Sequence, residues 1–254
     1  MRNEEDEKLK AWVTALEGRH LADLRVQEVT RALRALSSAY VERRERGERR
    51  HVHGALDTAG KRAAFALYYA PLHFIAVTEV THALGADRPA PSSIIDLGCG
   101  TGAAGAAWAI SGGSTSTVLG IDRHPWAVAE ARWTLQQLGV QGRVRQGDVG
   151  RLARSRPHAS VIAAYVLNEL PDDARRRVED DMVHAAERGG RILILEPLAR
   201  GVAPWWRATA ARITALGGRA DEWRLPIDPP PAVRLLGTAA GLNFHELRLQ
   251  TLFL

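Results

Sequence analysis

Cysteine is nearly absent from this sequence of 254 residues, which contains only Cys99. A framework of disulfides within the chain is therefore impossible, and a cysteine-rich zinc or iron–sulfur site is excluded. Histidines do not supply an alternative ligand set, because their spacings match no standard metal-binding run. The ones considered are His51, His53, His73 and His82. We therefore expect no metal centre.

Long apolar runs are also missing. No stretch approaches the roughly 20 apolar residues that span a bilayer. The residues from Met1 to Glu7 are acidic and polar, with no apolar segment behind them. We therefore expect neither a membrane span nor a signal peptide, and a cytoplasmic protein. With 46% hydrophobic and 25% charged residues, the composition is typical of a soluble globular protein.

The charge balance is moderately basic, at +5. It is compatible with an anionic partner such as RNA, but the arginine content is equally typical of a high-GC genome. The densest basic segment, Arg43–Arg50, also contains Glu45 and Glu48. It predicts a solvated helix face with ion pairs three and four residues apart. Contacts with RNA phosphates are the alternative for this segment.

The first part of the chain predicts helices and no strands. Apolar residues recur at helical spacing near the N-terminus, at Leu9, Trp12, Val13 and Leu16. Residues 63–84 are a second apolar helical stretch, in which Pro71 predicts a kink or a boundary because proline donates no backbone hydrogen bond. The Pro/Ser-rich residues 87–93 are typical of a linker. We therefore expect an all-helical N-terminal region over residues 1–88, as a lid or substrate-binding part, and a second domain over residues 89–254.

Alternating strands and helices follow the linker. Strands are predicted over residues 93–97, 117–121, 143–146, 159–166, 191–195 and 243–254, with 222–227 undecided. Helices are predicted over residues 103–110, 126–138, 172–187 and 205–216, and a short helix follows the Pro-rich residues 226–231. Such alternation is typical of an α/β fold, with a parallel sheet, helices on both faces and right-handed crossovers.

A glycine-rich loop, Asp96-Leu-Gly98-Cys-Gly100-Thr-Gly102, directly follows the first strand of this sheet. Ligands of open α/β sheets bind beyond the carboxyl ends of the strands, and glycines let the backbone approach them closely. Asp96 contributes negative charge near a cationic ligand, which fits the sulfonium and ammonium groups of S-adenosylmethionine (SAM). The dinucleotide pattern G-x-G-x-x-A also matches, ending at Ala103. A carboxylate before the first glycine repels a pyrophosphate, however, so we expect SAM rather than NAD in this loop.

Acidic residues also follow the next two strands. Asp122 closes the second strand and is placed to accept hydrogen bonds from both ribose hydroxyls of SAM. Asp148 follows the third strand and is placed to accept one from the adenine amino group, with Arg123 and Val149 beside the adenosine. A turn aspartate alone is commonplace. The three elements after successive strands, in this order, predict a class I SAM-dependent methyltransferase with a Rossmann-like sheet.

The methyl acceptor is expected beyond the fourth strand, which runs into Tyr165-Val-Leu-Asn168-Glu169-Leu-Pro171. Tyr165 is expected beside the cofactor. Asn168 can donate and accept hydrogen bonds, and Glu169 can accept a proton or neutralise a positive acceptor, so both are catalytic candidates. The alternative is that they only cap the next helix, with Pro171 at its start. Glu196, which closes the fifth strand, is a further candidate for the rim of the site.

Basic and aromatic residues of the N-terminal region offer a lid over the cofactor, with plain packing as the alternative. They are Lys61, Arg62, Tyr68, Tyr69 and His73. A basic residue or tyrosine among them is suited to the SAM carboxylate. Two chemistries are disfavoured. Methylation of cytosine C5 needs a cysteine nucleophile, but the single cysteine lies in the glycine loop. The Asn/Asp-Pro-Pro-aromatic tetrapeptide of exocyclic amino methylation is missing after the fourth strand.

Four segments together resemble one known family. They are Leu56–Phe74, Asp96–Gly102, Ala164–Pro171 and Gly189–Pro197. Over residues 56–203 the sequence resembles the bacterial relatives of the mitochondrial small-ribosomal-subunit methyltransferase-like assembly proteins. That resemblance implies association with small-subunit ribosomal RNA and SAM bound at Asp96, Gly98, Gly100 and Asp122. Family members carry a cysteine cluster, thought to hold an iron–sulfur centre, whereas residues 217–231 here contain none. The difference leaves room for a divergent substrate.

Three functions are consistent with these features. The first is SAM-dependent methyl transfer, with small-subunit ribosomal RNA as the acceptor. The second is O- or N-methylation of a small molecule, with the helical N-terminal region as a lid. The third is a non-catalytic RNA-binding factor of ribosome assembly that retains the fold. Turnover of SAM separates the third from the other two, and the labelled product separates the first from the second.

Overall fold

The computed structural model describes residues 2–46, 56–151, 158–198, 203–242 and 245–254. Its strands are β1 (Ser93–Leu97), β2 (Thr117–Asp122), β3 (Gly142–Gln146), β4 (Ser160–Ala164), β5 (Ile192–Pro197), β6 (Arg219–Pro226) and β7 (Glu246–Phe253). Its helices are α1 (Arg2–His20), α2 (Val26–Arg46), α3 (Ala59–Ala64), α4 (Ala70–Leu84), α5 (Ala103–Ser111), α6 (Pro125–Gln137), α7 (Asp172–Glu187), α8 (Trp206–Ala215) and α9 (Pro231–Ala240). Three short turns complete them: η1 (Phe65–Tyr69), η2 (Val149–Arg151) and η3 (Leu167–Glu169).

The strands form one seven-stranded sheet in the order β3-β2-β1-β4-β5-β7-β6. Strands β1 to β5 are parallel, and β7 runs antiparallel between β5 and β6. The carboxyl ends of the five parallel strands therefore lie along one edge of the sheet. The α/β, Rossmann-like fold expected from the sequence is confirmed, and the undecided segment 222–227 contributes to β6.

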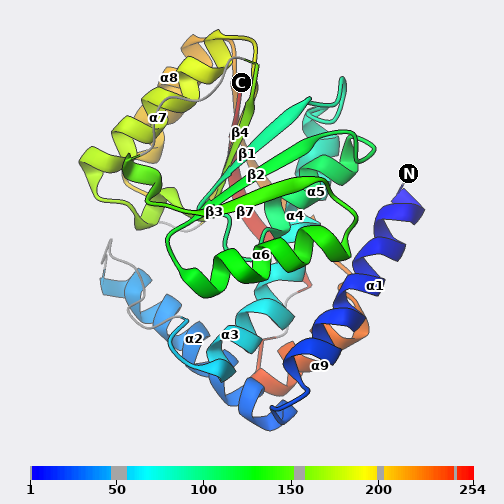
Figure 1. Ribbon diagram of the computed structural model, residues 1–254. Helices are drawn as coiled ribbons and strands as arrows, with labels where there is room; N and C mark the ends of the chain where they lie inside the picture. Colours follow the sequence, from blue (N-terminus) through cyan, green and yellow to red (C-terminus); the bar gives the residue numbers. More distant parts are fainter. Residues whose placement is uncertain (1, 47–55, 152–157, 199–202, 243–244) are drawn as a thin grey trace.

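Helices cover both faces of the sheet. Helices α5 and α6 pack on β1, β2 and β3, whereas α7 and α8 pack on β4 to β7 (Figure 1). The apolar side chains of β1, β2, β4 and β5 alternate between two apolar clusters. Ile94 and Ile162 belong to the cluster that contains α5, and Val161 and Ile192 belong to the one that contains α7. This arrangement explains why the central strands read as continuous apolar runs, since both of their faces are buried.

One long helix, Ala59–Leu84, consists of α3, η1 and α4 without a break. Within it, η1 is a π-helical turn, and the N–H of Ala70 donates to the carbonyl of Phe65, five residues back. Pro71 follows this turn and has no N–H to donate, so the wider turn falls where the α-helical pattern loses a bond anyway. The sequence predicts a kink or a boundary at Pro71. The structure instead shows one continuous helix that changes from π-helical to α-helical geometry just before this residue.

The same helix is long and apolar enough to cross a membrane, although polar residues interrupt its apolar stretches. Its most apolar window is 72% buried inside the protein, which identifies it as a core helix. We expected no helix of membrane length, and the burial of this one accounts for its composition. The cytoplasmic location remains a prediction.

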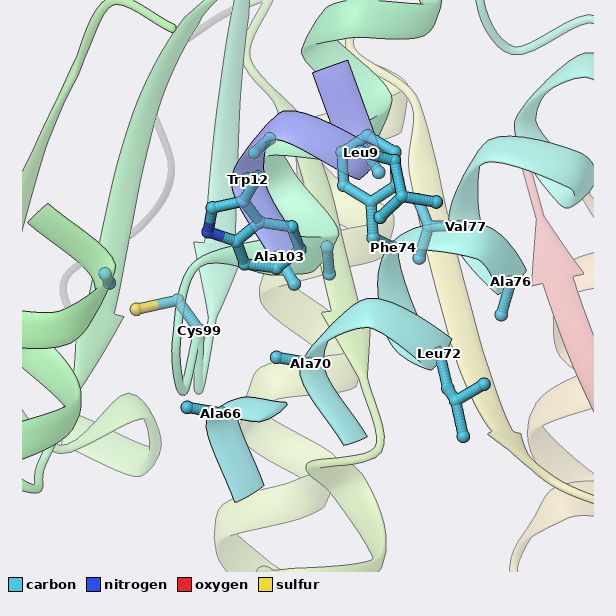
Figure 2. Packing of buried hydrophobic residues seen from close by; sticks show 14 of the residues in the cluster. Leu9, Trp12, Ala66, Ala70, Leu72, Phe74, Ala76, Val77, Cys99 and Ala103 are labelled. Carbon is cyan, nitrogen blue, oxygen red and sulfur yellow. The ribbon is translucent and has the colours of Figure 1, made fainter. Parts of the chain in front are cut away.

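The N-terminal helices share a core with the sheet. Trp12 of α1 lies against Phe74 of α4, with ring centroids 5.8 Å apart, and Figure 2 shows it between that ring and the segment from Cys99 to Ala103. Trp12 is 1% exposed, and all four residues belong to one apolar cluster. Helices α1 and α4 therefore pack on α5 and α6, which cover this face of the sheet, and α2 packs on α3 and α9. Their separation from residues 89–254 as a distinct domain remains a prediction.

Buried charges also attach α1. The carboxylate of Glu130 on α6 is fully buried and accepts hydrogen bonds from Arg19 at 3.1 Å and His20 at 2.7 Å. At the other end of α1, Glu5 contacts the ring of His82 at 3.0 Å. A buried carboxylate needs such partners to offset its lost hydration. The charged connector predicted at 43–50 lies largely outside the described residues, and nothing is described of its side chains.

Candidate functional site

The glycine loop joins β1 to α5 through three residues with left-handed backbone. Gly98, Gly100 and Gly102 have φ angles of +63°, +53° and +80°. Space is limiting as well, because a Cβ on Gly98 would lie 2.3 Å from Cγ2 of Val166. A Cβ on Gly102 would lie 3.1 Å from that of Ala131 on α6. Glycine is therefore required here both for conformation and for the close approach of neighbouring elements.

Asp122, at the end of β2, holds this loop in place. Its Oδ2 accepts a hydrogen bond from the N–H of Gly100 at 2.9 Å, and its Oδ1 accepts one from the N–H of His124 at 2.8 Å. The side chain is half-buried. Each carboxylate oxygen has a second acceptor direction, so the group can also bind ligand hydroxyls. Asp122 therefore combines a structural contact with the capacity expected of a ribose-binding residue.

Asp96 lies beneath the loop and is 1% exposed. Its Oδ2 accepts a hydrogen bond from the N–H of Gly105, in the first turn of α5, at 2.8 Å. The pKa of Asp96 is raised to about 7, mainly by burial and to a smaller extent by the charge of Asp122, although the N–H of Gly105 acts to lower it. The close contact requires Gly105, where a Cβ would lie 2.8 Å from the same oxygen. Asp96 thus supports the loop and the start of α5 from below.

The residues expected beside the adenosine lie after β2 and β3. Arg123 and Asp148 are exposed, and Val149 is buried in the cluster that contains α7. The Oδ1 of Asp148 accepts a hydrogen bond from the N–H of Gly150 at 2.9 Å, so it caps the η2 turn. All three occupy the carboxyl edge of the sheet, as the sequence predicts. Their contacts with a nucleoside remain a prediction.

Tyr165 directly follows β4 and has a left-handed backbone, with φ of +60°. Its N–H donates to the carbonyl of Leu195 on β5 at 2.8 Å, which fixes the end of the strand. Its ring stacks on that of His73 from α4, with centroids 4.3 Å apart and planes inclined by 23°. The expected strand 159–166 therefore ends at Ala164. The ring of Tyr165 contacts the N-terminal helix, whereas the next residues, Val166 and Leu167, pack in the cluster that contains α7.

Asn168 is held by a network on the α7 side of the sheet. Its Nδ2 donates to Oε2 of Glu196 at 2.6 Å, and its backbone N–H donates to Oε1 at 3.1 Å. Its Oδ1 accepts from the indole N–H of Trp205 at 3.0 Å. Glu196 is 1% exposed, and its pKa is raised to about 8, mainly by burial and to a smaller extent by the charge of Glu169. The amide of Asn168 is thus engaged on both sides, and Glu169 is half-buried beside it.

The N-terminal helix reaches this edge through aromatic side chains. A Cβ on Gly100 would lie 3.7 Å from Cε1 of Phe65, so that ring covers the glycine loop. Phe65 and His73 are in edge contact, with centroids 6.1 Å apart. The sequence offered His73 among several lid candidates but gave no sign of Phe65. The two residues are eight positions apart, or about two helical turns, and this spacing places them on the same face of the helix.

The structure therefore divides the predicted residues into three groups. The loop glycines and Asp122 meet at the ends of β1 and β2. Tyr165, Asn168 and Glu169 follow β4, and Asp148 with Val149 follows β3. Asp96 and Glu196, each 1% exposed, lie below the site surface, so Glu196 supports Asn168 and does not form the rim expected from the sequence. An open α/β sheet binds its ligand beyond the carboxyl ends of adjacent strands, and here the glycine loop lies at that edge.

Comparison with known proteins identifies this architecture. Residues 94–190 match the family described as "Methyltransferase domain". This part of the chain is therefore similar to methyltransferase domains. The match covers the glycine loop, Asp122 and the segment after β4.

Individual relatives are distant. Carboxy-S-adenosyl-L-methionine synthase of Chromohalobacter salexigens is 32% identical over 110 residues, which are 41% of this chain and 40% of that protein. The chain thus matches less than half the length of this curated relative. The structure of the mitomycin 7-O-methyltransferase MmcR has a TM-score of 0.50 at 16% identity, covering 96% of this chain and 72% of its own. Magnesium protoporphyrin IX methyltransferase of Synechocystis PCC 6803, crystallised with SAM, has a TM-score of 0.45 at 18% identity, covering 71% of this chain and 79% of its own.

Proposed function

We propose that the methyltransferase domain binds SAM and transfers its methyl group to an acceptor at the end of β4. The observation that carries this proposal is the hydrogen bond between Asp122 and Gly100, which sets a carboxylate beside a loop of left-handed glycines. That arrangement fits SAM, because the glycines leave room for the nucleoside and the carboxylate can accept from ribose hydroxyls. In this assignment Asp122 holds the ribose, and Asp148 with Val149 adjoins the adenine.

The buried carboxyl of Asp96 favours SAM over a dinucleotide. A dinucleotide site uses the free N–H groups at a helix N-terminus to bind a pyrophosphate. Here the N–H of Gly105 in the first turn of α5 already donates to Asp96. An acidic group at this position disfavours an anion and favours the positive charges of SAM.

SAM supplies the chemistry, since its methyl group is bonded to a positively charged sulfur and is transferred by in-line displacement. The residues of the chain contribute alignment and the removal of a proton from the acceptor. We assign proton acceptance to Glu169, which follows β4 and is half-buried. Asn168 has a positioning role, because Glu196 and Trp205 occupy its amide.

For the acceptor, small-subunit ribosomal RNA is supported by the resemblance of residues 56–203 to the ribosomal assembly family. A small molecule is supported by a different observation. The aromatic rings of Phe65 and His73 cover the glycine loop and the end of β4, and such cover restricts the size of what reaches the site. RNA binding without catalysis is the third proposal, and it differs from both in lacking turnover.

Incubation of the purified protein with methyl-labelled SAM and cell extract tests the proposal. We expect label in a single fraction: RNA for the ribosomal acceptor, or metabolites for the small-molecule acceptor. The Glu169→Gln variant is expected to bind SAM normally and transfer label slowly. SAM binding without labelling of RNA, protein or metabolites would contradict methyl transfer and support the non-catalytic factor. Label transfer at the wild-type rate by Glu169→Gln would remove this residue from the mechanism.

A further inference from the structure

Four aromatic rings form a continuous cluster at the carboxyl edge of the sheet. Phe65 contacts Tyr69 at 5.9 Å and His73 at 6.1 Å between centroids, and His73 stacks on Tyr165 at 4.3 Å. Three of these residues belong to the long N-terminal helix, and the fourth directly follows β4. We call these four residues the aromatic cluster. It joins the N-terminal helix to the methyltransferase domain at the site itself.

The exposure of the aromatic cluster differs from that of its neighbours. All four of its residues are half-buried, whereas Ala66, Tyr68 and Leu72 on the same helix are buried. The four cluster residues therefore keep part of their surface accessible, unlike the buried residues that lie between them on the helix. Accessible aromatic surface beside a glycine loop is surface that a ligand can contact.

Strand order relates the aromatic cluster to the rest of the site. Asp122, Gly98 and Tyr165 follow β2, β1 and β4, which are consecutive strands in the sheet. Neighbouring strands lie about 4.8 Å apart. In SAM the sulfonium is bonded to the ribose through a single methylene, so it stays close to the ribose subsite. With the ribose at Asp122, a sulfur on the β4 side of the glycine loop would meet the aromatic cluster.

Two unfavourable backbone features occur in the aromatic cluster. Tyr165 has a φ angle of +60°, which residues with a Cβ rarely adopt. The rings of Phe65 and Tyr69 are carried by the π-helical turn, a rare conformation found most often at functional sites. Strain of this kind persists where the surrounding structure enforces it, and its coincidence with a site indicates a role in ligand binding.

The aromatic cluster carries no positive charge at neutral pH. Burial lowers the pKa of His73 to about 4, so its ring is neutral at pH 7. Burial also raises the pKa of Tyr69 to about 12 and that of Tyr165 still higher, so both phenols stay protonated. Neutral aromatic rings attract a cation through their electron-rich faces, and a desolvated site strengthens this attraction.

We propose that the aromatic cluster binds the positively charged sulfur end of SAM and makes the site prefer SAM over its neutral product, S-adenosylhomocysteine. This inference rests on the proposed function, since it assumes that SAM occupies the glycine loop. The rings attract the sulfonium, and the product lacks that charge. The preference favours release of the product after methyl transfer. A cation–π contribution of ordinary strength corresponds to about 2- to 30-fold in the ratio of dissociation constants.

Titration calorimetry of the full chain with SAM and with S-adenosylhomocysteine tests the inference. We expect the wild type to bind SAM the more tightly of the two. Tyr165→Phe keeps the ring and is expected to keep that preference. Tyr165→Leu is expected to lose about 2- to 30-fold in SAM affinity, while its affinity for the product changes little. The ratio of the two dissociation constants therefore falls toward one. Phe253→Leu is the control, since it removes a half-buried ring at the opposite edge of the sheet.

The outcomes separate the inference from the proposed function. A wild type that binds neither compound overturns both. Equal affinities in the wild type, or an unchanged preference in Tyr165→Leu, overturn the inference and leave SAM binding intact. If circular dichroism shows that Tyr165→Leu does not fold, His73→Leu serves in its place with the same expected change. An unchanged preference in His73→Leu then overturns the inference.

Discussion

The carboxylate of Asp122, at the end of β2, accepts a hydrogen bond at 2.9 Å from the backbone N–H of Gly100, in the loop after the adjacent strand β1. The contact fixes the glycine loop relative to β2, and the second carboxylate oxygen fixes the turn at His124. One side chain thus sets the shape of the site and faces the nucleoside that we propose to bind there.

Replacing Asp122 with asparagine tests this double role. The amide presents an N–H₂ group toward one of the two backbone donors, Gly100 or His124, so one contact becomes repulsive. A charged hydrogen bond contributes about 1.5–3 kcal/mol, and we expect SAM affinity to fall by roughly 10- to 100-fold. Calorimetry measures the change. Asp148→Asn, in an exposed carboxylate of the same edge, is expected to change it less, and equal losses in the two variants would contradict a special role for Asp122.

Gly98→Ala is expected to destabilise the fold. A left-handed backbone costs a residue with a Cβ about 1–2 kcal/mol, and the clash with Val166 adds roughly 1–3 kcal/mol. Gly85→Ala is the matched control, because Gly85 has nearly the same φ, +64°, and no atom within 4 Å of an added Cβ. Chemical denaturation measures both. Equal losses in the two variants would show that Val166 yields freely and that the loop is less tightly packed than the structure indicates.

The architecture was largely predictable because its determinants are local in the sequence. Buried parallel strands such as Ser160–Ala164 are continuous apolar runs, and the Asp96–Gly102 loop marks the turn that follows β1. The strand β6 was not settled, because its residues alternate in exposure at the edge of the sheet and pair with β7 through antiparallel contacts. Such pairing depends on residues that lie 20 to 34 positions further along the chain.

The candidate site was predictable only in part, for a similar reason. The glycines and Asp122 carry a signal in their spacing, but the engagement of Asn168 by Glu196 and Trp205 depends on contacts 28 and 37 residues apart. The stack of His73 on Tyr165 joins residues from two separate parts of the fold. No periodicity relates such pairs, so the sequence named several of these residues without indicating how they meet.

Trp205→Phe is expected to cost about 0.5–1.5 kcal/mol of stability, because the Oδ1 of Asn168 loses its indole donor. The comparison is Trp223→Phe, which removes the indole hydrogen bond to Thr251 on β7, at 2.8 Å. Both variants should lose similar stability in denaturation. If Asn168 positions the segment after β4, only Trp205→Phe should also lower methyl transfer, and equal turnover in both would contradict that role.

Glu196 gives the stability a pH dependence. Its pKa is about 8 in the folded protein, above the ordinary 4.5, because burial disfavours the charged form. The folded state therefore holds a proton that the unfolded state has lost, and this group makes stability fall as pH rises from about 4.5 to 8. We expect the stability of Glu196→Gln to rise relative to wild type over that window in denaturation at several pH values. The exposed Glu222→Gln should show no such trend, and a constant difference for Glu196→Gln would contradict the shift.

A crystal structure of the protein with SAM tests the central claim most directly. We predict SAM along the carboxyl edge of the sheet, with the ribose hydroxyls on Asp122 and the sulfur beside Tyr165. An empty glycine loop at saturating SAM, or a dinucleotide retained from purification in its place, would contradict the account.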